Sequence, residues 1–243
     1  MPSVLILGAT SDIGFAIARK VASEKFAIQL AARNASQLKT FQSDIEIRYG
    51  VSCSIHDFDA NLFETHQSFY ESLHPKPGIT AYVIGYMNDN EKALQSWDES
   101  LKTIHANYTG AVSILNIIAR DYAAKQGGTI IGISSVAGSR GRQSNFIYGS
   151  AKAAFTAYLS GLRNKLYHNN VHVLTVLPGF VYTKMTEHLQ LPKLLTATPE
   201  QVANAVYTGV EKKRNVVYVK WFWKWIMLII TAIPESMFKK KKL

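Results

Sequence analysis

The sequence predicts a single α/β domain with a doubly wound parallel sheet, followed by an apolar and basic helical tail. Short β-branched runs alternate with segments of helical periodicity, and a glycine-rich turn follows the first run. The chain has 243 residues with 47% hydrophobic content, which is enough to build one full core. No repeat or linker interrupts this pattern, so we place one domain over residues 1–220 and the tail over residues 221–243.

The expected strands are short apolar runs, and the expected helices lie between them. We expect strands at residues 4–7, 27–32, 51–56, 81–85, 129–134, 171–177 and 216–219. We expect helices at residues 13–24, 36–48, 61–73, 94–125, 148–167 and from residue 200 onward. Because a helix separates each strand from the next, the strands can lie parallel, with helices on both faces of the sheet.

Positive charge is concentrated near the end of the chain. The net charge is +10. From Glu211 to Leu243, nine basic and two acidic residues give +7, which leaves +3 for the preceding 210 residues. The nearly balanced body argues against a nucleic-acid groove, whereas the basic tail favours an anionic membrane surface.

The amino-terminal residues and the cysteine usage suggest a compartment. Cys53 is the single cysteine, so the chain cannot form an intramolecular disulfide. The apolar stretch after Met1 is too short for a secretory signal and lacks a basic start. We therefore expect a cytoplasmic protein, peripheral on the cytoplasmic face of the membrane.

The turn after the first expected strand has the composition of a dinucleotide-binding loop. Gly8 permits a tight turn, and Gly14 allows helix and strand to pack closely while free N–H groups at the helix start meet a pyrophosphate. Two glycines also occur in ordinary strand-to-helix turns, so this motif alone leaves nucleotide binding open. The loop residues expected to contact a cofactor are Gly8, Thr10, Ser11, Asp12, Ile13 and Gly14.

The end of the second expected strand indicates which nucleotide is bound. An acidic residue there would accept a hydrogen bond from the ribose 2′-hydroxyl of NAD(H), whereas a basic residue pairs with the 2′-phosphate of NADP(H). Arg33 occupies this position and favours NADP(H), with NAD(H) as the alternative. A solvated loop arginine is the structural alternative. Asp57, at the end of the third strand, is expected to hold the adenine edge.

Three residues in the second half of the chain form a candidate chemical centre. Tyr148 and Lys152 are four residues apart and therefore share one helical face. An ammonium beside the phenol is expected to lower its pKa, so that Tyr148 exchanges a proton with a substrate oxygen near neutral pH. Ser135 follows the fifth strand and can hydrogen-bond the same oxygen where negative charge develops.

These motifs, in this order, resemble the short-chain dehydrogenase/reductase family over roughly the first 220 residues, which implies a Rossmann-like fold. Ser135, Tyr148 and Lys152 match the family's catalytic residues, and Asn107 matches the asparagine that completes its proton relay through water. The resemblance implies hydride transfer between a nicotinamide nucleotide and a carbonyl or alcohol carbon, with no metal. It also implies cofactor contacts by Gly85, Pro178, Gly179, Val181 and Thr183.

Two departures from the family pattern support a different class of function. Asp12 replaces the middle glycine of the loop, which places a carboxylate near the pyrophosphate unless the side chain turns outward to cap the helix. The family's Asn-Asn-Ala-Gly is reduced to Tyr82-Val83-Ile84-Gly85. The alternative is thus a catalytically weak nucleotide-binding scaffold or sensor at a membrane, although the complete catalytic set argues against it.

The tail combines tryptophans, aliphatic residues and lysines. Trp221–Ile233 predicts a helix about 20 Å long, shorter than the roughly 30 Å hydrocarbon core of a bilayer. Three of the four tryptophans lie here and Lys239 to Lys242 follow, so we expect the helix to lie in the interface of an anionic membrane. A contact with a partner subunit is the alternative, because the resemblance implies a homodimer or homotetramer.

The region after Gly179 indicates an apolar or amphipathic substrate. In the family, residues 180–198 form the substrate lid, and here the lid contains Met185, Leu189, Leu191, Leu194 and Leu195. The loop at residues 8–14 and the ending Ile-Pro-Glu-Ser-Met-Phe-Lys-Lys resemble more narrowly the reductases of polyprenyl-phosphate 2-keto-pentoses, which receive their substrate from a flavin enzyme. Those relatives use NADH, whereas Arg33 favours NADPH. A lipid or steroid ketone is the alternative substrate.

Overall fold

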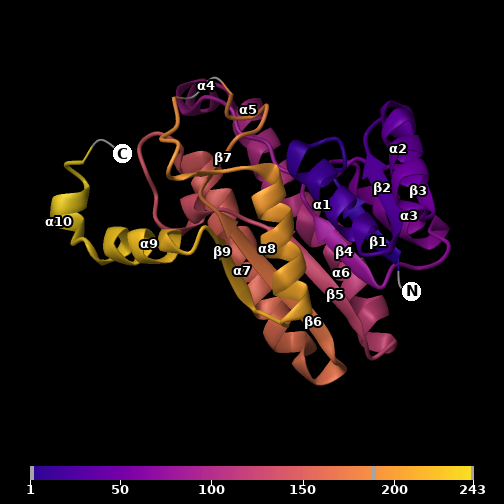
Figure 1. Ribbon diagram of the computed structural model, residues 1–243. Coiled ribbons are helices and arrows are strands. Elements are labelled where there is room, and N and C mark those ends of the chain that lie inside the picture. Colours follow the sequence, from indigo (N-terminus) through magenta and orange to yellow (C-terminus); the bar gives the residue numbers. More distant parts are fainter. Residues whose placement is uncertain (1–2, 188–189, 242–243) are drawn as a thin grey trace.

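Within residues 3–187 and 190–241, which the computed structural model describes, the chain forms a seven-stranded parallel sheet in the order β3-β2-β1-β4-β5-β6-β9 (Figure 1). The predicted α/β fold is therefore confirmed. A short parallel pair, β7 with β8, lies outside this sheet. The strands are β1 (Ser3–Leu7), β2 (Ala27–Ala32), β3 (Cys53–Asp57), β4 (Ile79–Tyr82), β5 (Gly128–Ile133), β6 (Val171–Pro178), β7 (Phe180–Val181), β8 (Thr196–Ala197) and β9 (Val216–Val219).

Helices cover both faces of the sheet. Helices α1, α2 and α8 share one hydrophobic cluster with it, and α3, α6 and α7 share the other. The helices are α1 (Asp12–Ser23), α2 (Lys39–Tyr49), α3 (His66–Ser72), α4 (Asn90–Gln95), α5 (Trp97–Ile104), α6 (Gly110–Ala124), α7 (Phe146–Leu166), α8 (Pro199–Glu211), α9 (Phe222–Ala232) and α10 (Glu235–Phe238). Short 3₁₀ turns lie at Ala35–Leu38, Phe63–Thr65, Val136–Ser139 and Tyr167–Asn169, and a π turn lies at His105–Thr109.

Burial explains why the strands are nearly continuous apolar runs. Every residue of β1 is buried, since helices cover it from both faces and β2 and β4 pair with its two edges. From β1 the chain builds outward to β2 and β3 on one side, and then to β4, β5, β6 and β9 on the other. The crossovers leave β1 and β4 in opposite directions, so a crevice opens at the carboxyl ends of these strands.

Two predicted elements differ from the structure. The long helix expected at residues 94–125 is interrupted at Ser96, which separates α4 from α5 and caps α5 by accepting the Glu99 N–H at 3.4 Å. A π turn then lies between α5 and α6. The strand expected at residues 81–85 ends at Tyr82. Residues 83–85 instead leave the sheet and line the crevice described below.

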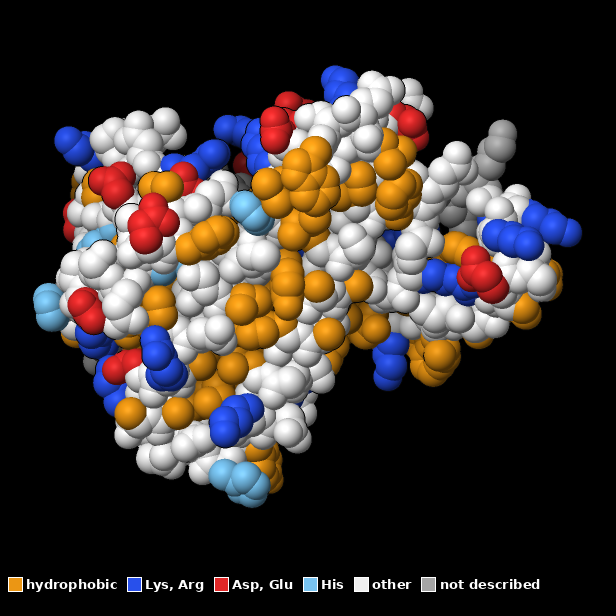
Figure 2. Space-filling model, turned by 180° about the vertical axis from the view of Figure 1, so that it is seen from behind, with side chains coloured by type: hydrophobic (Ala, Val, Ile, Leu, Met, Phe, Trp, Pro, Cys, Tyr) orange, Lys and Arg blue, Asp and Glu red, His pale blue; other side chains and the backbone are white. Residues whose placement is uncertain are grey.

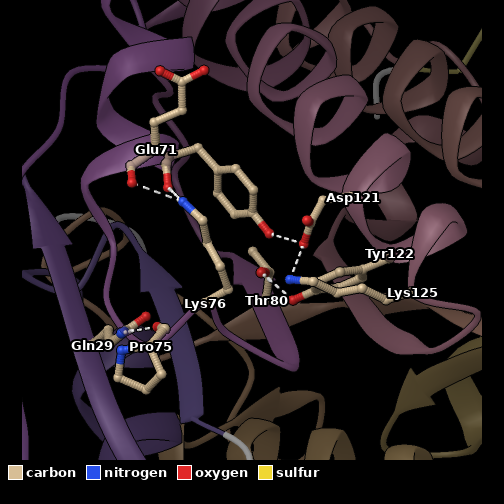
Figure 3. Close-up of polar contacts among 9 residues, drawn as sticks. Gln29, Glu71, Pro75, Lys76, Thr80, Asp121, Tyr122 and Lys125 are labelled. Carbon is tan, nitrogen blue, oxygen red and sulfur yellow. Dashed lines mark hydrogen bonds and ion pairs between the residues drawn. The ribbon is translucent and has the colours of Figure 1, made fainter.

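Polar side chains pair with one another at the amino-terminal edge of the sheet (Figure 3). The Tyr122 hydroxyl lies 2.9 Å from the Thr80 hydroxyl. Tyr70 donates to Asp121 Oδ2 at 2.6 Å, and Lys125 Nζ reaches the same oxygen at 2.6 Å. We call these five residues the amino-edge network. It satisfies buried phenols and connects β4, α3 and α6.

The tail forms α9 and α10 and packs on the body of the domain. Trp223 and Met227 on α9 are buried against Val136 and Leu177, and this small cluster is separate from the two large ones. Within the described residues, none of the helices combines the length and apolar character needed to cross a membrane. The face of α9 that carries Trp223 and Met227 is thus covered by the domain itself. The contact with a membrane or a partner subunit expected of residues 221–243 stays a prediction for the remaining surface of the tail.

Candidate active site

A cleft of about 440 Å³ opens at the carboxyl edge of the sheet. It receives residues that follow β1, β2, β4, β5 and β6, together with the start of α7. The sequence-predicted site residues that line it are Gly8, Thr10, Ser11, Asp12, Ile13, Arg33, Gly85, Ser135, Tyr148, Lys152, Pro178, Gly179, Val181 and Thr183. Gly14, Asp57 and Asn107 are not among the lining residues.

The glycine loop has the backbone that a phosphate cradle needs. Gly8 has φ +95°, and a β-carbon there would lie 2.8 Å from Ile84 Cγ1. A larger residue would therefore be strained and would clash with Ile84, in the segment that follows β4. Ser11 caps α1 by accepting the Gly14 N–H at 3.0 Å. Since the start of α1 faces the cleft, its remaining N–H groups and its dipole can bind an anion.

Asp12 is the first residue of α1, but it does not cap the helix. Its Oδ2 accepts the backbone N–H of Lys184 at 2.8 Å. The carboxylate is therefore turned toward the lid segment, and this bond joins the glycine loop to residues that follow β7. The residue that departs from the family pattern makes a long-range contact between the two sides of the cleft.

The two residues expected at the adenosine end are placed differently. Arg33 is exposed and lines the cleft directly after β2. Asp57 Oδ1 instead accepts the Ala35 N–H at 2.8 Å and holds the turn that follows Arg33. The adenine contact expected of Asp57 is not supported by this position. Phe58 and Asp59 line the cleft in its place.

Helix α7 and the end of β5 bring together the candidate chemical centre. The backbone of α7 is fixed to β5 because Ser134 Oγ donates to Lys152 O at 3.0 Å and pairs with Thr156 Oγ1 at 2.7 Å. Lys152 is only 3% exposed, and its Nζ lies 5.7 Å from the centre of the Tyr148 ring. Ser135 also lines the cleft, so the three side chains face one space as the sequence predicts.

The ionisation of this centre differs from the expectation. Burial raises the pKa of Tyr148 to about 12, and the neighbouring Ser135 hydroxyl only partly opposes that shift. Burial lowers the pKa of Lys152 to about 7. The expected lowering of the Tyr148 pKa by Lys152 is therefore not found, because both groups are desolvated and the Lys152 ammonium donates to Ile133 O at 3.0 Å.

Asn107 lies in the π turn between α5 and α6, fully buried. Its Nδ2 donates to Tyr86 O at 2.5 Å and to Thr103 O at 2.8 Å. A β-carbon on Gly85 would lie 3.3 Å from Asn107 Oδ1 and 3.6 Å from Lys152 Nζ. Asn107 and Lys152 therefore approach the same point beside Gly85, and only a glycine leaves that space free.

Some lining residues were not predicted. Trp223 comes from the tail, stacks on Gly179 so closely that a β-carbon there would lie 2.0 Å from the indole, and donates from Nε1 to Leu195 O at 3.1 Å. Its only signal in the sequence was its position near other tryptophans, which suggested a membrane. Further lining residues without a signal include Tyr86, Met87, Lys102, Arg142 and Asn145. Met185 had been assigned to the lid and also lines the cleft.

Comparison with known proteins decides the family. Residues 2–193 match the short chain dehydrogenase family. The chain is also 31% identical over 240 residues to an uncharacterized oxidoreductase of Mycobacterium tuberculosis H37Rv, covering 98% of this chain and 96% of the relative. This protein belongs to the short-chain dehydrogenase family. As a member it is an oxidoreductase that interconverts alcohol and carbonyl groups with a nicotinamide nucleotide.

Other similarities cover most of the chain. The 3-oxoacyl-[acyl-carrier-protein] reductase FabG of Aquifex aeolicus is 30% identical over 220 residues, covering 83% of this chain and 87% of the relative. A short-chain dehydrogenase from Sphingobium yanoikuyae, solved in complex with NADPH, has a TM-score of 0.84 at 21% identity and covers 98% of both chains. The latter similarity supports the fold.

Proposed function

We propose that this protein is an NADPH-dependent reductase of a ketone carried on a membrane-associated lipid, and that a polyprenyl-phosphate 2-keto-pentose is the substrate to test first. The proposal rests on one observation, which is that the catalytic residues and a residue of the tail line the same cleft. Ser135, Tyr148 and Lys152 line the same cleft as Trp223, which belongs to the apolar and basic tail. The chemical centre therefore opens next to the segment that has the composition of a membrane anchor.

Each catalytic residue has a chemical role in this proposal. A nicotinamide nucleotide supplies the hydride when it is bound in the cleft. Tyr148 holds the proton that the substrate oxygen receives, and Ser135 donates a hydrogen bond to that oxygen as its negative charge develops. Lys152 orients the nicotinamide ribose and stabilises a phenolate at Tyr148. Asn107 holds Tyr86 and Thr103 in place, since its Nδ2 donates to both carbonyl oxygens and its Oδ1 accepts the Tyr86 N–H at 3.3 Å.

The cleft suits an anionic dinucleotide. Its lining includes five Lys or Arg residues and two Asp residues, and one of these two, Asp12, is already bonded to the lid. The Gly8 turn and the start of α1 offer backbone N–H groups for a pyrophosphate. Arg33, exposed at the end of β2, is placed to pair with a 2′-phosphate, which is why we propose NADP(H) over NAD(H). Phe58 and Asp59 are the proposed adenine contacts.

The free face of α9 supports membrane docking. Trp221, Trp225, Leu228 and Ile229 are between 53% and 73% exposed, whereas the other face of the helix is buried. In Figure 2 hydrophobic and basic side chains lie close together on the projecting tail. Lys224 and the exposed residues Lys239 to Lys241 can bind anionic head groups, while Lys242 and the lid residue Leu189 lie outside the described residues.

A second exposed apolar area supports a homo-oligomer. Trp97 on α5 is 69% exposed and Phe146 at the start of α7 is 39% exposed, and both border a shallow groove between these helices. Hydrophobic side chains gather over this part of the molecule in Figure 2. We propose that a second copy of the chain covers it. The test is molar mass by light scattering for wild type and Trp97→Glu; an unchanged mass in the variant contradicts this interface.

The test of the activity is NADPH oxidation with a panel of ketones. The panel contains a polyprenyl-phosphate 2-keto-pentose, a 3-oxoacyl thioester and a keto steroid, each presented with anionic vesicles. We expect the highest kcat/KM with the lipid-linked keto-sugar. A higher value with the 3-oxoacyl thioester would select the alternative suggested by the similarity to the Aquifex enzyme, and no oxidation with any ketone would contradict the proposal.

The test of docking changes only the exposed face of α9. The variant Trp225→Ser/Leu228→Ser/Ile229→Ser keeps Trp223 and Met227, which pack on the domain. We expect it to lose most of its sedimentation with anionic vesicles while keeping its thermal unfolding temperature within a few degrees. Equal sedimentation of wild type and variant would contradict membrane docking.

A further inference from the structure

Arg142 lies in the loop between the 3₁₀ turn after Ser135 and helix α7. The backbone of this loop is held on both sides. Asn145 N–H donates to Arg142 O at 3.1 Å, and Gly149 N–H donates to Asn145 O at 2.7 Å, within the first turn of the helix that carries Tyr148. Asn90 Nδ2 reaches Gln143 O at 3.5 Å from the opposite side. The Cα of Arg142 is therefore fixed relative to the catalytic tyrosine.

The side chain of Arg142, in contrast, has no protein partner to explain it. Among the described residues no carboxylate lies within ion-pair distance of it, and its buried Nε has no hydrogen-bond partner. It lines the cleft, and burial lowers the pKa of its guanidinium, which nevertheless stays charged at neutral pH. The buried Asn145 Oδ1 nearby also lacks a partner. Buried polar groups without partners are uncommon and call for an explanation.

Arg140, two residues earlier, shows what a structural arginine does in this loop. Its Nη1 donates to Ile230 O at 2.7 Å and to Ile233 O at 2.6 Å, and its Nη2 pairs with Glu235 at 2.8 Å. Its guanidinium also stacks on the Phe238 ring at 3.7 Å. Arg140 uses its donors to hold the tail, whereas Arg142 keeps its donors free toward the cleft.

The other cations of the cleft have different placements. Lys152 donates to Ile133 O, and Lys102 lies 3.5 Å from Glu99 and over the Tyr86 ring. Arg33 is exposed at the adenosine end, directly after β2, and Lys184 is exposed in the lid segment. Arg142 is thus the half-buried cation at the chemical end whose charge no described acidic residue balances.

We infer that Arg142 binds an oxyanion of the substrate close to the reacting carbonyl group. This inference rests on the proposed function, because it assumes that the carbonyl meets Tyr148. A guanidinium can bind a phosphate or carboxylate through two parallel N–H donors, and its poorly hydrated position strengthens that bond. The preferred substrate is then a ketone with a phosphate or carboxylate on a neighbouring carbon.

A polyprenyl-phosphate 2-keto-pentose has this arrangement, since the keto carbon is next to the carbon that carries the phosphate. A 3-oxoacyl chain on a carrier has no anion so close to its ketone. Arg142 would therefore discriminate between these two substrate classes, and Met87, Met185 and Trp223 would contact the apolar part of the ligand.

Binding tests the inference without turnover. Protein saturated with NADP⁺ is titrated calorimetrically with hexyl phosphate and, separately, with hexan-1-ol. We expect hexyl phosphate to bind at least tenfold more tightly than hexan-1-ol, and this preference to fall about tenfold in Arg142→Gln. Arg142→Lys should retain part of it. Arg120→Gln is the matched control, because Arg120 is an exposed arginine on the far helix α6 that contacts Gln67. Equal binding of both ligands by wild type, or identical preferences in the two glutamine variants, would overturn the inference.

Turnover gives an independent readout with a different pair of ligands. Dihydroxyacetone phosphate carries its phosphate next to the ketone, and dihydroxyacetone is the neutral counterpart. The ratio of their kcat/KM values should fall about tenfold in Arg142→Gln and not in Arg120→Gln. If the ketones are reduced but this kcat/KM ratio is the same in wild type and Arg142→Gln, the role of Arg142 is contradicted and the proposed function is not. Hexyl phosphate binding that depends on Arg142, without reduction of any ketone, contradicts the proposed function and keeps the anion site.

Discussion

Polar side chains at the two edges of the central sheet differ in how completely they are paired with other side chains. At the amino edge, Tyr122 pairs with Thr80, and Asp121 accepts from both Tyr70 and Lys125 (Figure 3). At the carboxyl edge, Tyr148 lies beside the Ser135 hydroxyl, and Lys152 donates to Ile133 O without forming an ion pair with any carboxylate of the described residues. Paired groups stabilise the fold, whereas groups left without strong partners in a cleft indicate where a ligand completes the site.

Lys125 and Lys152, at the two edges, differ in exposure and in whether their charge is paired with a carboxylate. Lys125 is exposed enough to keep water and forms an ion pair with Asp121 at 2.6 Å. Lys152 is almost fully buried, and desolvation brings its pKa to about 7. Burying an ammonium in that position lowers the stability of the fold, so stability does not explain Lys152. Its position is explained by the partners it would have during turnover, a bound nucleotide and the Tyr148 phenolate.

The largest expected effect separates two tyrosines, Tyr148, which lines the cleft, and Tyr122, which is buried. Tyr148→Phe should lower kcat by about 10²-fold to 10⁴-fold, because it removes the proton donor. Tyr122→Phe removes a hydroxyl at the other edge and should leave kcat within twofold. NADPH titration by fluorescence should give similar Kd values for wild type and both variants. A Tyr148→Phe enzyme with near-normal turnover would contradict the catalytic assignment.

Stability as a function of pH sharpens the comparison of the lysines. The folded-state pKa of Lys152, about 7, is below the ordinary lysine value of 10.5, so between these pH values the unfolded chain binds more protons than the folded chain. The unfolding free energy of the nucleotide-free protein should therefore rise from pH 7 to pH 9, by up to about 1.4 kcal/mol per pH unit from this group.

Urea unfolding at the two pH values measures that slope. Lys152→Met should flatten it and should stabilise the nucleotide-free protein most at pH 7 and below. Lys125→Met, at the amino edge, should keep the wild-type slope. If Lys152→Met unfolds with the wild-type pH dependence, the lysine is not buried in the free protein as described here.

A smaller effect is expected at the amino edge itself. Tyr122→Phe leaves the Thr80 hydroxyl buried without its partner and should lower the unfolding free energy by about 1–3 kcal/mol. Tyr122→Phe/Thr80→Val removes both hydroxyls and should recover part of that loss. Urea unfolding measures both changes. A double variant less stable than the sum of the single variants would show that this pair is not the main effect of the hydroxyls.

The smallest expected effect concerns Asp12, which joins the glycine loop to the lid. Asp12→Ala removes the acceptor of the Lys184 N–H, so we expect KM for NADPH and for the ketone to rise about fivefold with kcat nearly unchanged. Glu200→Ala is the control, because Glu200 also lies in the first turn of a helix but on α8. A change in kcat alone would mean that Asp12 acts on the chemical step instead of on lid closure.

Local patterns predicted much of the fold and the chemical centre. The four-residue spacing of Tyr148 and Lys152 depends only on helix geometry, and the Gly8 turn depends on its own backbone. The sequence could not show Arg142 or Trp223 in the cleft, because their positions depend on a loop and a tail packing over residues distant in the chain. The bond from the Ala35 N–H to the Asp57 carboxylate also had no signal in the sequence, and the adenine contact of Asp57 stays a prediction.

The packing of Trp223 over Gly179 links the active-site cleft to the tail that we propose binds the membrane. The indole covers the turn after β6 and donates to Leu195 O. One wall of the cleft is therefore formed by the tail, a segment that could otherwise be removed as a separate membrane anchor. A variant truncated after Val219 would lose this wall of the cleft together with the proposed membrane binding. The catalytic domain and the proposed membrane-binding tail are thus not separable modules, and we expect gene fusions or deletions at this terminus to alter turnover.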